Sequence, residues 1–381
     1  MASKPAEFAQ WAIRARLESQ VNRVIPLDPF FDKMRYIQRA SIRFPSWLAN
    51  KNSPNLCILP AGYQKWVEKL ISKLSRNPTY SLSGDEDPDL PSFLRPLLHI
   101  CERQTRLSAL GRQHTEMDIR AVIDSLVIYT YEAEQMRTLR YSAEQTLKLP
   151  FIRTKNFDVA TITADGVHSL EITDLDLNEE YKFCEIVSAI KGVGAKTPTA
   201  LSLVHCVTEY KRTGSGVNGA MMGMVSALYQ KRVLGLDHFV FGIYQCRTEF
   251  IRIVAAAWQD NKIKVYEVGS YSLKCPVQVI QFYFVLREIK RLGYEYADEV
   301  KSSNFALLQL FKEDPPGDIW ARDDLSAIPE TTDESDAQEK YGESSGHTDI
   351  SVTASIIKGP QTSTKSNKQR TQSWYIQTQV S

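Results

Sequence analysis

The feature that most constrains the fold is a buried strand that leads through a glycine-rich turn into a helix. Residues 201–211 (LSLVHCVTEYK) form an apolar run that ends in charged residues, which is typical of a strand that reaches the edge of a sheet. Glycines punctuate residues 213–216, and residues 217–234 then carry a helical apolar stripe that stops at Gly235. We therefore expect this helix to pack closely on its own strand.

Further strands are predicted on both sides of this unit. Residues 157–163 and 167–172 alternate apolar and polar side chains around Ala164-Asp165-Gly166, which predicts a hairpin. Three more strand-like segments and a final helix follow, at residues 239–244, 250–258, 263–268 and 276–292. The order of these elements predicts a mixed α/β, or α+β, sheet, with an antiparallel meander after the central helix, and not a regular βαβ array.

The first part of the chain is predicted to be helical. Residues 7–24 and 64–75 show spaced apolar positions with charges between them. Thr115 and Asp118 resemble a capping pair at the start of a further helix, which we expect to continue towards Leu147. The predicted domains are a helical region at residues 1–114, an α/β core at 115–312 and a tail at 313–381.

Composition separates the tail from the body. Residues 313–349 hold twelve acidic and two basic side chains, and residues 351–381 hold four basic and no acidic ones. Such a polar segment buries too little apolar surface to offset the entropy of ordering, so we expect a disordered tail through which a protein partner can bind. The tail sums to −6 within a total of +1, so the body carries +7, which suits a polyanionic partner.

Cysteine usage and apolar runs set the expected compartment. The six cysteines form no CxxC pair and the six histidines are scattered, which predicts reduced thiols and no structural zinc site. No apolar run approaches the roughly 20 residues that span a bilayer. The chain start shows neither a secretory signal nor a transit peptide. We expect an intracellular protein, nuclear or cytoplasmic, that is neither secreted nor embedded in a membrane.

The sharpest chemical feature is Glu209-Tyr210-Lys211 at the end of the central strand. Side chains alternate along a strand, so Glu209 and Lys211 point the same way. The carboxylate can hold a hard divalent cation, and the ammonium can orient a water or stabilise charge on a phosphate. A metal needs a second acid. Asp158 is placed best by the pattern, and the alternatives are Asp165, Asp174 and Asp176.

This arrangement resembles the PD-(D/E)XK nuclease superfamily, whose restriction-endonuclease-like core runs helix, three-stranded meander, helix, strand. The resemblance covers roughly residues 115–295. It implies that Phe157-Asp158 stands at the position of the proline and aspartate, and Glu209-Tyr210-Lys211 at that of the E-x-K. The long gap between them implies an insertion at residues 173–196.

The resemblance also implies a function, metal-dependent cleavage of DNA phosphodiesters. Asp158, Glu209 and the Tyr210 carbonyl would hold Mg²⁺ or Mn²⁺, and Lys211 would position the attacking water. Gln230 would support the site from the helix, and Glu116 would be an additional acid. Arg212, Lys231 and Arg232 flank the site as candidate nucleic-acid contacts. An alternative of the same fold is a catalytically inactive module that binds nucleic acid or protein.

A competing motif spans the turn and the helix. Gly214, Gly216 and Gly219 match GxGxxG after a strand, which has the form of a dinucleotide-binding fingerprint. The strand before it ends in charged residues, and no series of βαβ units follows. We therefore keep a dinucleotide-binding enzyme as an outside alternative, against a simple turn with close helix packing.

Overall fold

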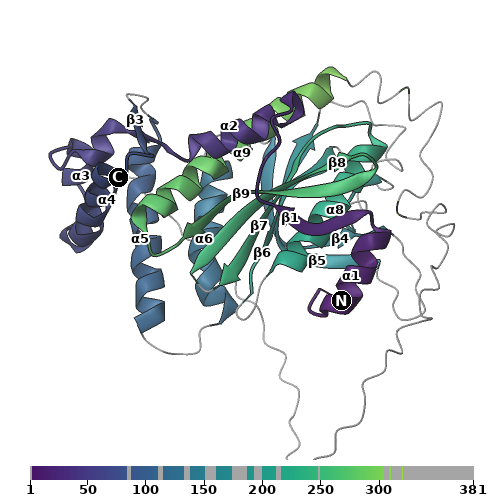
Figure 1. Ribbon diagram of the computed structural model, residues 1–381, viewed down its shortest axis with the longest axis horizontal. Helices are drawn as coiled ribbons and strands as arrows, with labels where there is room; N and C mark the ends of the chain where they lie inside the picture. The colour runs from purple at the N-terminus through teal and green to yellow at the C-terminus, as the bar shows by residue number, and fades with distance from the viewer. Residues whose placement is uncertain are drawn as a thin grey trace, which may run out of the picture. The chain divides into compact units, whose positions relative to one another are not determined.

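Seven strands form one mixed sheet in the computed structural model, in the order β1-β9-β8-β7-β6-β5-β4 (Figure 1). The structure describes residues 2–83, 87–109, 115–132, 138–150, 160–173, 187–192, 200–211, 216–247 and 249–303, with Gln309 and Trp320. The chain divides into a unit at Met1–Pro329 and a unit at Glu330–Ser381, and every described residue belongs to the first.

The strands of the sheet are β1 (Leu17–Asn22), β4 (Leu139–Lys148), β5 (Thr161–Ile172), β6 (Leu201–Glu209), β7 (Val240–Arg247), β8 (Phe250–Gln259) and β9 (Lys262–Ser272). Two neighbouring pairs are parallel, β1 with β9 and β6 with β7, and the other pairs are antiparallel. A separate parallel pair joins β2 (Arg43–Pro45) to β3 (Ser81–Ser83).

The α-helices that the structure describes are α1 (Pro5–Arg14), α2 (Asp32–Ala40), α3 (Pro54–Cys57), α4 (Gln64–Arg76), α5 (Leu90–Ala109), α6 (Glu116–Glu132), α8 (Val217–Val233) and α9 (Pro276–Ser302). The described residues also form three short 3₁₀ helices, η1 (Pro29–Phe31), η2 (Ser46–Ala49) and η3 (Ala61–Tyr63). None of the helices in the described ranges combines the length and apolarity that a bilayer crossing requires.

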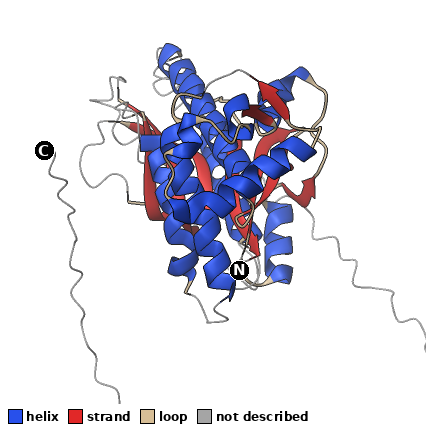
Figure 2. Ribbon diagram, turned by 90° about the vertical axis from the view of Figure 1, so that its left-hand side faces the viewer, coloured by secondary structure: helices blue, strands red, loops and turns tan. Residues whose placement is uncertain are grey.

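The helices cover both faces of the sheet, and each face has its own core. Helix α8 packs on β6 and β7, and its apolar side chains share one buried cluster with α1 (Figure 1). Helices α2, α6 and α9 cover the other face, with α4 and α5 packed against α9 (Figure 1). Figure 2 shows helices packed closely against the strands. This three-layer arrangement confirms the predicted mixed α/β sheet.

Several predicted elements are confirmed. Strand β6 and helix α8 occupy the segments expected of them, and β7, β8 and β9 form the predicted antiparallel meander. The capping pair is also present: the Asp118 amide donates to Thr115 Oγ1 at 3.1 Å, and that hydroxyl donates to the Asp118 carboxylate at 2.8 Å.

The predicted hairpin around Asp165 is wrong. Residues 161–172 form the single strand β5, which runs through Ala164-Asp165-Gly166 without turning. Its partner is β4, which pairs Ala143 with Gly166 along an antiparallel ladder. The Tyr141 ring of β4 lies where a β-carbon of Gly166 would stand, so this glycine makes room for a ring and not for a turn.

Two predicted helices extend too far into strand segments. Helix α6 ends at Glu132, and the residues towards Leu147 form β4 because they pair with β5. Helix α1 ends at Arg14, Arg16 takes a positive φ of 56°, and the chain then continues as β1 beside β9. In both cases long-range pairing overrides a helical pattern that local sequence alone supports. Helix α9, in contrast, runs ten residues beyond the expected end at 292, to Ser302.

The boundary of the predicted tail also needs correction at one residue. Trp320 lies inside the predicted tail, yet its exposed fraction is only 7% and it belongs to the buried cluster of α1 and α8. The rest of residues 313–381 lies outside the described residues. The body therefore extends at least to Trp320.

Candidate functional site

The candidate site lies at the sheet edge where β6 ends. Glu209 is the last residue of β6, and Lys211 follows two residues later. Strand β5 pairs Gly166 with Thr208 in an antiparallel register, so Asp165 stands at the level of Glu209 on the neighbouring strand. Tertiary pairing thus brings an acid of β5 to the carboxylate and ammonium of the Glu-Tyr-Lys sequence.

Glu209 is a buried carboxylate with a single cationic partner. Its exposed fraction is 5%, and Lys211 Nζ donates to Oε1 at 2.7 Å. The other oxygen, Oε2, is buried and has no hydrogen-bond partner within the described part of the chain. Burial raises the pKa of Glu209 to about 7, against the lowering effect of Lys211, and the nearby charge of Asp165 raises it further. The site therefore holds an acid that changes its charge near neutral pH.

Helix α8 begins directly over Glu209, and its glycines permit this approach. A β-carbon at Gly216 would lie 2.8 Å from the Glu209 carbonyl oxygen, and one at Gly219 would lie 2.5 Å from Oε1. One turn later, a β-carbon at Gly223 would lie 3.2 Å from Val207. These glycines are explained by close packing of α8 on β6, which was one of the two interpretations of the GxGxxG motif. Gly214 lies outside the described residues.

Asp165 is held by donors from two directions. The Tyr210 amide donates to Oδ2 at 2.6 Å, and the Arg120 guanidinium lies 3.5 Å from Oδ1. Arg120 also donates to the Asp165 carbonyl at 3.3 Å. The Asp165 carboxylate is therefore fixed between strand β6 and helix α6.

Arg120 is itself part of a buried network. Its Nε donates to Asp124 at 2.8 Å one turn along α6, and the Tyr141 hydroxyl donates to the other Asp124 oxygen at 3.0 Å. The Arg120 side chain is only 7% exposed, and Glu144 lies 3.7 Å away at the rim. Sequence analysis did not single out Arg120, although its spacing of four from Asp124 on a helix was a visible signal.

Lys211 lies close to three acids, Asp165 of β5, Glu209 of β6 and Glu116 of α6. Burial alone would lower its pKa, but the hydrogen bond and charge of Glu209, with the charges of Asp165 and Glu116, raise that pKa above its usual value. Lys211 therefore stays protonated and positively charged at neutral pH. Glu116, the first residue of α6, lies close enough to act on it electrostatically.

The donor set suits a loosely held magnesium ion better than a closed metal cage. No cluster of three or more His, Cys, Asp or Glu side chains able to hold a metal ion occurs among the described residues. Mg²⁺ commonly binds through one or two carboxylates and keeps waters and substrate oxygens as its other ligands. Asp165 and Glu209, whose Oε2 is buried without a partner, meet that requirement.

Several acids and one cation from the sequence prediction cannot be placed. Asp158, Asp174, Asp176 and Arg212 lie outside the described residues. Among the acids that the sequence left open, Asp165 is the one that the structure brings to Glu209.

Gln230 lies away from the site. It follows Gly219 by eleven residues, about 16 Å along α8 at about 1.5 Å per residue. Its amide accepts from the Val204 N–H at 3.0 Å and donates to the Ser202 carbonyl at 2.8 Å. Strand β7 pairs with β6 only from Cys206 onward, so Gln230 satisfies backbone groups that β7 does not reach. Its role here is structural, not the support of a catalytic group.

Lys231 and Arg232 lie in the last turn of α8, whereas the candidate site lies at the start of this helix. Lys231 is fully buried, donates to the Phe239 carbonyl at 2.9 Å, and burial lowers its pKa to about 7. Because it is enclosed, it cannot contact DNA.

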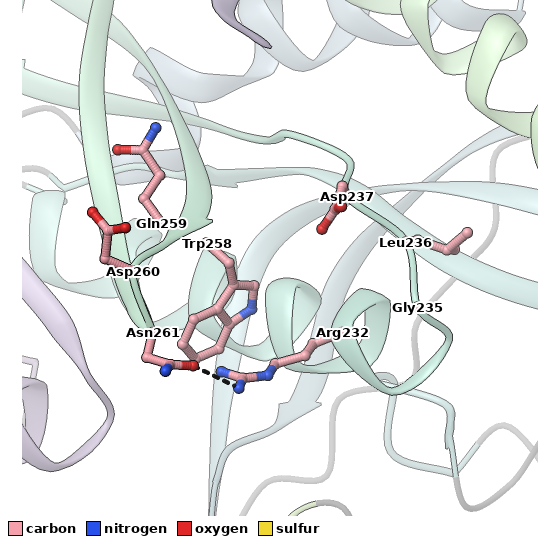
Figure 3. A pocket seen from close by; sticks show the side chains of 8 residues that line it. All are labelled: Arg232, Gly235, Leu236, Asp237, Trp258, Gln259, Asp260 and Asn261. Carbon is pink, nitrogen blue, oxygen red and sulfur yellow. Dashed lines mark hydrogen bonds between the residues drawn. The ribbon is translucent and has the colours of Figure 1, made fainter.

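Arg232 lies 4.3 Å from the ring centre of Trp258 and donates to Asn261 at 3.0 Å (Figure 3). The pocket around it also contains the acids Asp237 and Asp260, which disfavour a phosphate there. The prediction that Lys231 and Arg232 flank the site is therefore wrong.

Comparison with known proteins adds no functional assignment. No protein-family model matches the chain, and no curated protein matches it either.

Proposed function

We propose that this protein is a metal-dependent nuclease that hydrolyses DNA phosphodiesters. The observation that carries the proposal is the grouping of Asp165, Glu209 and Lys211 at one sheet edge, with Lys211 Nζ 2.7 Å from Glu209. Carboxylates that can hold a hard cation, beside an ammonium that can hold a phosphate or a water, are the parts that this hydrolysis needs.

The order of elements supports the same proposal. Helix α6 is followed by the antiparallel strands β4, β5 and β6, then by α8, then by β7 parallel to β6. This is the helix, meander, helix, strand order of the PD-(D/E)XK superfamily that the sequence resembles. Asp165 on the second of these strands takes the place first given to Asp158.

In the proposed reaction each side chain has one task. Asp165 and Glu209, with the Tyr210 carbonyl, would hold Mg²⁺ or Mn²⁺, which supplies Lewis acidity and a deprotonated water at neutral pH. Lys211 holds the water or a phosphate oxygen, because its ammonium is fixed by Glu209 at the sheet edge. Arg120 orients Asp165, through contacts with both its carboxylate and its carbonyl oxygen.

The test is divalent-ion-dependent nicking of plasmid DNA by the unchanged protein and by Asp165→Asn, Glu209→Gln and Lys211→Ala. We expect the two acid variants to lose both metal binding, measured by calorimetry with Mn²⁺, and nicking. Lys211→Ala should keep metal binding and lose nicking. Equal activity in all four proteins would contradict the assignment.

A second candidate is a catalytically inactive module of the same fold that binds DNA or a protein. Arg120 favours it, because a guanidinium 3.5 Å from Asp165 Oδ1 already neutralises the carboxylate that the metal needs. Absence of both Mn²⁺ binding and nicking in the unchanged protein would select this candidate. A protein partner that binds residues 313–381 remains compatible with either function.

A further inference from the structure

A row of side chains crosses three strands of the sheet at the level of Glu209. The parallel register pairs Glu209 of β6 with Tyr244 of β7, and the antiparallel register pairs Tyr244 with Arg252 of β8. Ile251 and Ile253 face the core on the α9 side, so Arg252 between them faces the α8 side, as Tyr244 does. Arg252 thus shares both the edge and the face of the candidate site.

Arg252 is held in position but is not fully satisfied. It is hydrogen-bonded to the Tyr244 hydroxyl, and its side chain keeps an exposed fraction of 34%. Glu267 forms an ion pair with it, at 3.6 Å from Nε to Oε1, which is longer than a hydrogen bond. Nε is buried and has no hydrogen-bond acceptor among the described residues, so a ligand would meet the exposed part of the side chain.

The chemistry of this position suits a phosphate. Arginine stays charged at all working pH values and presents a planar fork that matches phosphate oxygens. Beside it, Ser270 of β9 pairs with Arg252 and is exposed, so the position is open to a ligand on that flank.

We propose that Arg252 binds a backbone phosphate of a polynucleotide whose neighbouring phosphodiester lies at Asp165 and Glu209. Two strand spacings separate Arg252 from Glu209, about 10 Å. A duplex strand carries a phosphate for about every 3.4 Å of its axis, so nearby phosphates of one strand reach both positions. This inference rests on the proposed nuclease function and adds to it a contact with a second phosphate of the DNA strand.

The binding test compares Arg252→Gln with Arg232→Gln. Arg232 is the matched control because it lies at the C-terminal end of α8, away from the candidate site. Fluorescence anisotropy of a labelled DNA duplex in EDTA measures affinity without cleavage. Arg252→Gln should weaken binding about tenfold at low salt, through loss of a charge-assisted contact. It should also reduce the slope of log K against log salt by about one. Arg232→Gln should change neither quantity, and thermal unfolding should show that both variants fold.

The cleavage test separates this inference from the nuclease proposal. On bis(p-nitrophenyl) phosphate, which has no second phosphate, Arg252→Gln should keep the kcat/KM of the unchanged protein, while on DNA its KM should rise about tenfold.

Unchanged DNA affinity in Arg252→Gln, an equal loss in both variants, or no DNA binding by the unchanged protein would each overturn the inference. A selective loss of affinity in Arg252→Gln without any cleavage by the unchanged protein would uphold the phosphate contact and reject the nuclease.

Discussion

Gly219 lies directly over the carboxylate of Glu209, so close that a β-carbon at residue 219 would stand 2.5 Å from Oε1 and 2.6 Å from Cδ. No real side chain tolerates such a contact without displacing its neighbour. The glycine of α8 therefore fixes where the buried acid of β6 can lie, and a motif with the form of a nucleotide fingerprint has a packing explanation.

Gly219→Ala should reduce metal affinity and cleavage by more than tenfold, because the methyl group pushes Glu209 away from Asp165. Overpacking costs about 1–3 kcal/mol, partly offset by about 1 kcal/mol of helix propensity, so the stability loss should stay modest. Calorimetry with Mn²⁺ and chemical denaturation measure the two effects. Gly62→Ala is the control, since nothing lies within 4 Å of its added β-carbon. Full metal affinity in Gly219→Ala would contradict the contact.

The raised pKa of Glu209 predicts a pH dependence of stability. Burial raises that pKa from 4.5 to about 7, so between these values the folded protein holds a proton that the unfolded chain has released. The stabilisation is complete below about pH 4.5 and is lost as the pH rises through about 7, an effect of up to about 3 kcal/mol.

Glu209→Gln should remove this slope from the free energy of unfolding, measured by urea denaturation across pH 4.5–8. If the proposed metal site exists, Mn²⁺ should raise the melting temperature of the unchanged protein more at pH 8 than at pH 5.5, because a metal ion binds the ionised form of a carboxylate. Identical pH profiles of the two proteins would refute the burial of an ionisable acid at this position.

Gln230→Leu should destabilise the fold without touching the site. The change leaves the Val204 N–H and the Ser202 carbonyl without their side-chain partner, at a cost of about 2–4 kcal/mol. Metal affinity per folded molecule should stay unchanged, because Gln230 contacts neither Asp165 nor Glu209. Gln10→Leu on the exposed face of α1 is the control and should cost less than about 0.5 kcal/mol. A loss of metal binding at full stability would restore the catalytic role that the sequence suggested.

The burial of Trp320 predicts that two truncated chains differ in melting temperature. A chain that ends at residue 329 should unfold like the full chain, whereas one that ends at residue 319 loses a side chain that is 93% buried in the α1 and α8 cluster. Loss of a buried tryptophan costs about 3 kcal/mol or more, which should appear as a clearly lower melting temperature. Trp320→Ala in the full chain is the matched variant. Equal melting temperatures of both truncations would return the tail boundary to about residue 313.

The sequence by itself determined the elements whose pattern is local and strong. Strand β6, helix α8 with its stop at Gly235, the meander of β7, β8 and β9, and the capping pair of Thr115 and Asp118 all follow from side-chain periodicity and turn chemistry. The same-face pairing of Glu209 with Lys211 is also local, because it needs only the alternation of a strand.

Only the tertiary structure decided which residues accompany that pair. Asp165 resembled a turn residue because Ala164-Asp165-Gly166 has turn composition, but pairing with β4 and β6 makes it a strand residue opposite Glu209. Arg120 reaches the site through packing of α6 on the sheet. Lys231 is withdrawn from solvent because its ammonium donates to the Phe239 carbonyl and lies over the Tyr296 ring. The periodicity of the sequence predicts the face of a strand or helix on which a side chain lies. Strand register and the packing of layers bring together residues that are far apart in the chain, and they determine the neighbours of that side chain.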